Sequence, residues 1–243
     1  MRTRPKFNPS RIWLEREIAS FAGGLADGAR ILDAGAGDQI YRALFERQIY
    51  QAADFERVDK PYAKSDYVCD LSCIPVKDNS FDAVLFSQVM EHLPEPAVVL
   101  RELKRVLRPG GVLFFSAPLF YEEHETPYDF YRYTQFSIKY LFEKEGFEID
   151  RIDWLEGYMG TLHYSLRRMV KHLRFVRPSD LGGGVLAWTT LAVLTVLRPL
   201  ASVAAHLAGR CDVKHRFKKR GYPINYLAVV RLADPSRGNA QQS

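Results

Sequence analysis

Cysteine is scarce in this sequence of 243 residues, and its three copies, Cys69, Cys73 and Cys211, form no C-x-x-C pair. Such a sparse, odd set excludes a disulfide framework, gives no support for a zinc site, and favours a reducing compartment. No uninterrupted apolar run opens the chain, because charged residues recur at positions 11–17, so a secretory signal is not predicted. The expected location is therefore the cytoplasm.

An excess of positive charge is missing from most of the chain. Residues 158–222 contain twelve Lys or Arg and two acids, a net charge of +10, whereas the remainder has 22 bases and 27 acids, a net charge of −5. The overall charge of +5 thus comes from one late segment, and an anionic partner is expected there. With 47% hydrophobic residues, the composition is otherwise that of an ordinary globular domain.

Short apolar runs alternate with longer amphipathic segments over the first 150 residues. This alternation predicts a parallel sheet with helices on both faces. The predicted strands are 29–37, 49–54, 66–70, 82–87 and 111–118, followed by 147–157 and 225–232. The predicted helices are 9–22, 39–48, 97–108 and 134–146.

A glycine turn follows the first predicted strand, in the run Asp33-Ala34-Gly35-Ala36-Gly37. Glycines permit a tight turn and let a ligand approach the backbone, while a helix N-terminus supplies free N–H groups. Ile40 stands where a dinucleotide site needs its third glycine, and the Gly-Lys-Ser/Thr of a phosphate-binding loop is missing. A tight turn without a ligand remains the alternative.

Acidic residues end three successive predicted strands, at Asp33, Asp54 and Asp70. The carboxyl ends of parallel strands line one rim of a sheet, where ligands bind. Asp54 is placed to accept two ribose hydroxyls, and Asp70 to accept an adenine amino group beside the Leu71 N–H. Each Asp alone is more often a turn residue. Asp59 replaces Asp54 if the second strand runs longer.

Residues 31–37, Asp54, CDLSCIPVKDNSFDAVLFSQVMEHLPEP (69–96) and LRELKRVLRPGGVLFFSAP (100–118) together resemble class I S-adenosylmethionine-dependent methyltransferases, in particular the type 11 group. The resemblance covers about residues 29–150, and HETPYDFYRYT (124–134) resembles the signature of a subgroup. It implies a doubly wound, Rossmann-like seven-stranded sheet, mostly parallel with the last strand antiparallel, and S-adenosyl-L-methionine as cofactor.

The resemblance also implies roles for individual positions. Asp33, Gly35 and Gly37 surround the methionine part of the cofactor, Asp54 binds the ribose, Asp70 and Leu71 the adenine, and Ser87 and Gln88 lie on the rim beside the methyl group. Gln39 occupies the place of the family's third glycine, where its side chain is expected to narrow the cofactor path.

Methyl transfer needs alignment and, for a hydroxyl acceptor, removal of a proton, but no metal. The candidate bases are His124, His92 and Asp129, and His124 is favoured because its loop follows the fifth strand. His92 is expected to position its loop. Arg132 either clamps an acidic acceptor or pairs with Asp129.

The predicted organisation is a cofactor-binding domain at 1–157 plus 223–234, a helical insertion at 158–222 and a tail at 235–243. Because the insertion joins strands six and seven, it is expected to overhang the cofactor rim. Its 17 uncharged residues at 181–197 make about 26 Å of helix, short of a bilayer core of about 30 Å. The favoured interpretation is an interfacial or re-entrant hairpin bent at Pro199 that docks on an anionic membrane through 167–220. A buried helix over the sheet edge and a dimer contact are the alternatives.

The sequence thus predicts methyl transfer to a small-molecule, glycan or lipid-linked acceptor. The alternative is a non-catalytic protein that keeps the cofactor fold and serves as a membrane or protein adaptor, against which the paired Asp54 and Asp70 argue. Nucleic acid is disfavoured as a partner. The Asn/Asp-Pro-Pro-Tyr element of base N-methylases is absent, since its place reads Ser87-Gln88-Val89-Met90.

Overall fold

A computed structural model describes residues 7–56 and 63–233 of the chain. These residues form two compact units, a helical unit of residues 7–13 and 156–224 and a sheet unit of residues 14–155 and 225–233 without 57–62. Asp59 and the tail at 235–243 lie outside the described residues.

The sheet unit is built on seven strands in the order β3-β2-β1-β4-β5-β7-β6. Neighbours from β3 to β5 pair in parallel, whereas β7 runs antiparallel to both β5 and β6. The predicted seven-stranded sheet with an antiparallel last strand is confirmed. The strands are β1 (Arg30–Ala34), β2 (Ile49–Asp54), β3 (Tyr67–Val68), β4 (Phe81–Ser87), β5 (Leu107–Pro118), β6 (Phe147–Trp154) and β7 (Asn225–Leu232).

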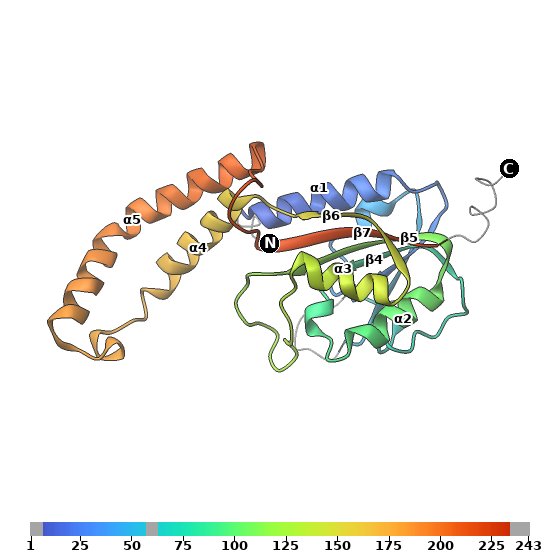
Figure 1. The fold of residues 1–243 in the computed structure, drawn as a ribbon, viewed down its shortest axis with the longest axis horizontal. Coiled ribbons are helices and arrows are strands. Elements are labelled where there is room, and N and C mark those ends of the chain that lie inside the picture. The colour runs from blue at the N-terminus through green and yellow to red at the C-terminus, as the bar shows by residue number, and fades with distance from the viewer. Residues whose placement is uncertain (1–6, 57–62, 234–243) are drawn as a thin grey trace. The chain divides into compact units, whose positions relative to one another are not determined.

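Helices cover both faces of this sheet, with α1 (Pro9–Gly23) on one side and α2 (Pro96–Val106) and α3 (Gln135–Lys144) on the other (Figure 1). Successive residues of a strand point to opposite faces of the sheet. Phe114 and Phe115 of β5 are an example of this alternation. The Phe114 ring lies 5.6 Å from that of Phe21 in α1, and the Phe115 ring 5.1 Å from that of Phe142 in α3. The core therefore lies on both sides of the central strands.

Two predicted elements of the sheet unit differ from the structure. The predicted helix at 39–48 is wrong, because only the 3-10 helix η1 (Arg42–Phe45) forms there. Gln39 adopts a left-handed backbone with φ 54°, which no α-helix tolerates, and too few residues remain before β2 begins. The strand predicted from Gly111 begins earlier, at Leu107, where α2 has ended and Leu107 pairs with Phe81.

The helical unit contains α4 (Tyr158–His172), η3 (Pro178–Leu181) and α5 (Gly184–Lys214). The predicted hairpin bent at Pro199 is wrong, because α5 continues through Pro199 as one curved helix and pairs instead with α4 (Figure 1). Small residues allow this pairing. The His163 ring of α4 bonds the Ala205 carbonyl at 2.7 Å, and a Cβ on Gly209 would lie 2.6 Å from His163 Nδ1.

Helix α5 is long and apolar enough to cross a membrane, with a mean hydropathy of 1.7 over its most apolar window, of which 11% is buried. Its buried residues are mostly small, and its large apolar residues point outward. The placement of the insertion over the cofactor rim stays a prediction.

Candidate functional site

A cavity of about 360 Å³ opens at the carboxyl ends of β1, β2 and β4, within the sheet unit. Ligand pockets in proteins begin at about 300 Å³, so the cavity is large enough for a small molecule. One wall is polar and comes from the strand ends, with Gly35, Asp54, Asp70, Leu71 and Gln88. The lining also includes the rings of Phe55, His92, Tyr128 and Phe130.

The glycine turn after β1 has the geometry that the motif predicts. Gly35 has a φ of 82°, and a Cβ there would lie 2.4 Å from a methyl carbon of Val89, so only glycine fits. Gly37 has a φ of 52°, and among the described residues nothing lies within 4 Å of its Cβ position, which leaves that side open to a ligand. The Gly35 and Ala36 N–H groups donate to the Ala53 carbonyl at 2.8 and 3.1 Å, which fixes the turn.

Asp54, at the end of β2, is only 5% exposed and lines the cavity. Its carboxylate accepts from the Gly37 N–H at 2.9 Å and from the Glu56 N–H at 3.0 Å. Two backbone donors leave part of its acceptor capacity for a ligand, because an ionised carboxylate has about four lone-pair sites. The carboxylate thus ties the glycine turn to the second strand and faces the cavity.

Asp70 and Leu71 follow β3 and line the cavity together. The Asp70 carboxylate accepts from the Ser72 N–H at 2.9 Å, as a turn aspartate does. Within the described part of the chain, the N–H of buried Leu71 has no hydrogen-bond acceptor. Buried N–H groups are seldom left unpaired, so this one suits a ligand acceptor.

Asp33 lies in β1, 5% exposed, and accepts a short hydrogen bond from the Tyr50 hydroxyl. Burial raises the pKa of Asp33 to about 7, against the lowering effect of the Tyr50 hydrogen bond. Asp33 is not among the described residues that line the cavity.

Ser87 and Gln88 end β4 and share one partner in β5. The Ser87 hydroxyl lies 2.9 Å from the Ser116 hydroxyl, to which the Gln88 amide also donates at 3.1 Å. Gln88 has a φ of 58° and lines the cavity, whereas Ser87 is not part of the described wall.

Gln39 does not narrow the cavity as the sequence led us to expect. Its side-chain amide donates to the Lys64 carbonyl at 2.9 Å, and its oxygen accepts from Arg42 at 2.8 Å. The side chain is therefore held away from the described cavity wall, which does not include it.

His124, Asp129 and Arg132 come together in the loop after β5. Arg132 donates to both oxygens of Asp129 at 2.6 and 2.8 Å, and the His124 backbone N–H donates to the same carboxylate at 2.8 Å. These hydrogen bonds, chiefly those from Arg132, lower the pKa of Asp129 to about 2. Arg132 therefore pairs with Asp129, one of the two roles that the sequence allowed.

His92 rather than His124 forms the described cavity wall. Its Nδ1 lies 2.5 Å from the Tyr128 carbonyl, and its ring centroid is 4.7 Å from that of His124. Burial lowers the pKa of His92, so the neutral ring is favoured. His124 is not part of the described wall.

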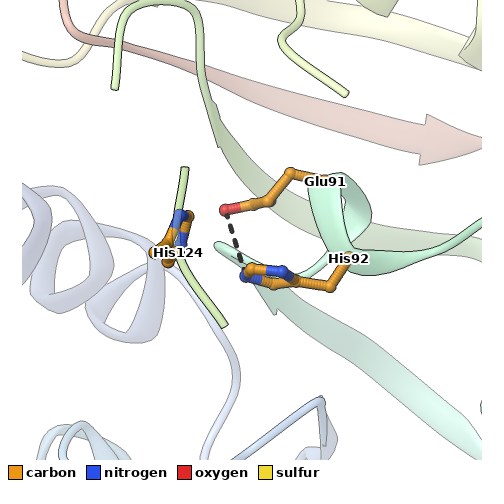
Figure 2. A group of neighbouring side chains, drawn as sticks. All are labelled: Glu91, His92 and His124. Carbon is orange, nitrogen blue, oxygen red and sulfur yellow. Dashed lines mark ion pairs between the residues drawn. The ribbon is translucent and has the colours of Figure 1, made fainter. Parts of the chain in front are cut away.

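Glu91 is a residue that the sequence reasoning missed. Its side chain is fully buried, and neither carboxylate oxygen has a hydrogen-bond partner in the described part of the chain. Burial raises the pKa of Glu91 to about 8. Figure 2 shows Glu91 beside His92 and His124. The available signal was an acid directly before a histidine at a strand end.

Comparisons with known proteins agree with this geometry. Residues 32–115 match the family described as a methyltransferase domain. The chain is 31% identical over 132 residues to a ubiquinone biosynthesis O-methyltransferase of Neisseria meningitidis, covering 47% of this chain and 52% of that protein. A second enzyme of that name, from Acinetobacter baylyi, is 30% identical over 129 residues, covering 46% and 51%.

Over residues 32–115 the chain is thus similar to methyltransferase domains. It spans about half the length of the curated relatives that it matches.

Solved structures share the fold of this chain. The [4+2]-cyclase SpnF has a TM-score of 0.56 at 17% identity, covering 93% of this chain and 81% of that one. A Burkholderia thailandensis 1,6-didemethyltoxoflavin-N1-methyltransferase, solved with S-adenosylhomocysteine, has a TM-score of 0.53 at 15% identity, covering 94% and 80%. A cyclase and a methyltransferase on one fold show that the fold alone does not decide the reaction.

The polar residues of the cavity fit S-adenosylmethionine as a cofactor. Gly37 lies in the turn beside the cavity and has an open face. Asp54 and Leu71 line the cavity, where Asp54 has lone pairs left over and Leu71 has an unpaired N–H among the described residues. The roles of Asp33, Ser87 and the other predicted contacts remain predictions.

Proposed function

We propose that the chain transfers the methyl group of S-adenosylmethionine to a hydroxyl oxygen of a small-molecule acceptor, free or attached to a lipid. The observation that carries the proposal is the cavity, whose lining combines carboxylates at the strand ends with aromatic rings. The matched relatives are named O-methyltransferases, which favours oxygen as the acceptor atom.

The polar wall is proposed to hold the nucleoside. Asp54 accepts the ribose hydroxyls with the lone pairs that Gly37 and Glu56 leave free. Asp70 accepts the adenine amino group, and the Leu71 N–H donates to a ring nitrogen. The hydrogen bonds to the Asp54 and Asp70 carboxylates have a charged acceptor and contribute about 1.5 to 3 kcal/mol each.

When bound, the cofactor supplies a methyl carbon on a positively charged sulfur that leaves as a neutral thioether. The acceptor oxygen bonds to that carbon, the electrons of the broken S–C bond stay on sulfur, and the hydroxyl proton must leave the oxygen. Phe130 and Tyr128 exclude water from this end of the cavity and align the acceptor. The predicted catalytic roles of His124, Asp129 and Arg132 remain proposals.

The test is to incubate the full chain with a methyl-labelled donor and separated pools of cell lipid, glycan, protein and small molecules. We expect label in the lipid or small-molecule pool, in a linkage that resists mild base as an ether does. Label in the protein or glycan pool alone, or in none of the pools, would contradict the proposal.

The same assay addresses the adaptor alternative. A non-catalytic protein with an intact cofactor pocket binds S-adenosylhomocysteine yet labels none of the pools. Binding and labelling measured on one preparation therefore separate the two functions.

We infer in addition that α5 docks on an anionic membrane. Val185, Leu186 and Trp188 at its start are 80%, 80% and 66% exposed, and nothing in the helical unit covers them within the described residues. Exposed Arg174 and Arg177 lie in the turn just before this end of the helix. Apolar side chains beside basic ones suit the interface of an anionic bilayer, and the tryptophan suits its headgroup level.

Flotation with vesicles of phosphatidylcholine alone or with added phosphatidylglycerol tests this docking. We expect flotation that rises with the anionic fraction and is lost in Leu186→Glu. Phe136→Glu in α3, a matched change at a residue 74% exposed, should float as the wild type does. Equal loss in both variants, or no flotation of the wild type, would overturn the inference. The cytoplasmic location also stays a proposal.

A further inference from the structure

Three ligand-type side chains gather where the lining of the cavity meets the loop after β5. One potential metal-ligand atom from each of Glu91, His92 and His124 lies within 4.8 Å of the other two (Figure 2). The closest measured approach is 3.9 Å, between a Glu91 oxygen and His92 Nε2. That distance is too long for a hydrogen bond.

The carboxylate of Glu91 is the unusual member of the group. It is fully buried, and both of its oxygens lack a hydrogen-bond donor in the described part of the chain. Burying an unpaired polar group costs several kcal/mol, and buried charges are normally paired or bound to metals. A positively charged ligand at this point supplies the missing partner.

Both histidines are oriented as metal ligands are. His92 Nδ1 faces the Tyr128 carbonyl at 2.5 Å, and His124 Nδ1 faces Asp129 at 3.4 Å and the Glu122 carbonyl at 3.3 Å. When Nδ1–H donates to such an oxygen, Nε2 keeps its lone pair for a metal. Arg132 in turn fixes the Asp129 carboxylate through two hydrogen bonds.

We propose that Glu91, His92 and His124 bind one divalent transition-metal cation, with Zn²⁺ as the representative ion. Two imidazoles and one carboxylate are a ligand set of catalytic zinc sites, which keep a further position open. Zinc ligands in a tetrahedron stand about 3.3 Å apart, so the group closes by roughly 1 Å when the ion binds.

The open position faces the cavity, because His92 is part of its wall. Resting on the proposed function, the cation takes the hydroxyl oxygen of the acceptor as its fourth ligand. Coordination lowers the pKa of that hydroxyl, so its proton leaves to solvent before the oxygen bonds to the methyl carbon.

The experiment measures Zn²⁺ binding directly, without turnover. The full chain carrying Cys69→Ser and Cys73→Ser, which removes competing thiols, is stripped with a chelator and titrated with Zn²⁺ against a chromophoric chelator. We expect one Zn²⁺ per chain and at least a tenfold loss of affinity in Glu91→Gln, His92→Gln and His124→Gln. Asp129→Asn, which weakens the contact that orients His124 and the pairing with Arg132, should cost about tenfold to a hundredfold.

His215→Gln is the matched control, since His215 is exposed and lies in the helical unit. It should bind Zn²⁺ as the parent does. Circular dichroism melting checks that each variant is folded, without any cofactor. Binding that Glu91→Gln leaves unchanged, or that His215→Gln weakens equally, would overturn the site. Zinc binding without methyl transfer would instead contradict the proposed function and leave the site standing.

Discussion

Asp33 offers a test of burial in the sheet unit through the pH dependence of stability. The pKa of Asp33 is about 7 in the folded chain and 3.8 for a free side chain, because burial disfavours the charged form. Between these two values the unfolded chain has released the proton that the folded chain keeps. Raising the pH from about 4 to 7 therefore removes up to about 4 kcal/mol of stability, at about 1.4 kcal/mol per pH unit.

Asp33→Asn keeps an acceptor for the Tyr50 hydroxyl but cannot ionise. The free energy of unfolding of each protein is measured with urea at each pH. The value for Asp33→Asn minus the value for the wild type should rise between pH 4 and 7 and level off above pH 7. Tyr50→Phe removes the hydrogen bond that lowers the pKa of Asp33, so the rise should extend to higher pH. A difference between wild type and Asp33→Asn that does not change with pH would refute the reasoning.

Other substitutions test the turn and the packing. Gly35→Ala should destabilise the fold by about 2 to 4 kcal/mol, through left-handed strain and overlap with Val89. Adding Val89→Ala should restore only the part of the lost free energy of unfolding that comes from the overlap. If the losses of the two single variants simply add up in the double variant, as measured by urea unfolding, the contact is contradicted. Gln39→Gly should change the affinity for S-adenosylhomocysteine less than threefold, since Gln39 turns toward Lys64; binding ten times tighter would show that Gln39 does obstruct the cofactor. Gly209→Ala should lower the melting temperature of the helical unit, because its Cβ would meet His163, and an unchanged melt would refute that packing.

The strands of the sheet could be predicted because burial on both faces leaves continuous apolar runs. Ile49–Asp54 and Asn225–Leu232 have the bounds that the sequence suggested. The helix expected at 39–48 failed for a local reason. Its composition suits a helix, but the backbone of Gln39 takes the turn geometry that the glycine motif imposes.

Site residues at the ends of strands could be predicted from the sequence, whereas site residues brought together from distant loops could not. Asp54, Asp70 and Leu71 end successive strands, so topology alone brings them to one cavity. His92 and His124 are 32 positions apart, and only the folded loop shows that His92 forms the wall. Glu91 gave no sequence signal of burial, because a charged residue is normally expected at the surface.

The cofactor pocket is the claim on which the rest depends, and titration calorimetry with S-adenosylhomocysteine tests it directly. The full chain should bind one equivalent, and Asp54→Ala should weaken binding by about 1 to 3 kcal/mol. Asp66→Ala is the matched control, because Asp66 also accepts a backbone N–H, that of Ala52 at 2.8 Å, but is not part of the described cavity wall. Its affinity should equal that of the wild type. No heat of binding in the wild type, or equal affinities for Asp54→Ala and Asp66→Ala, would contradict the account.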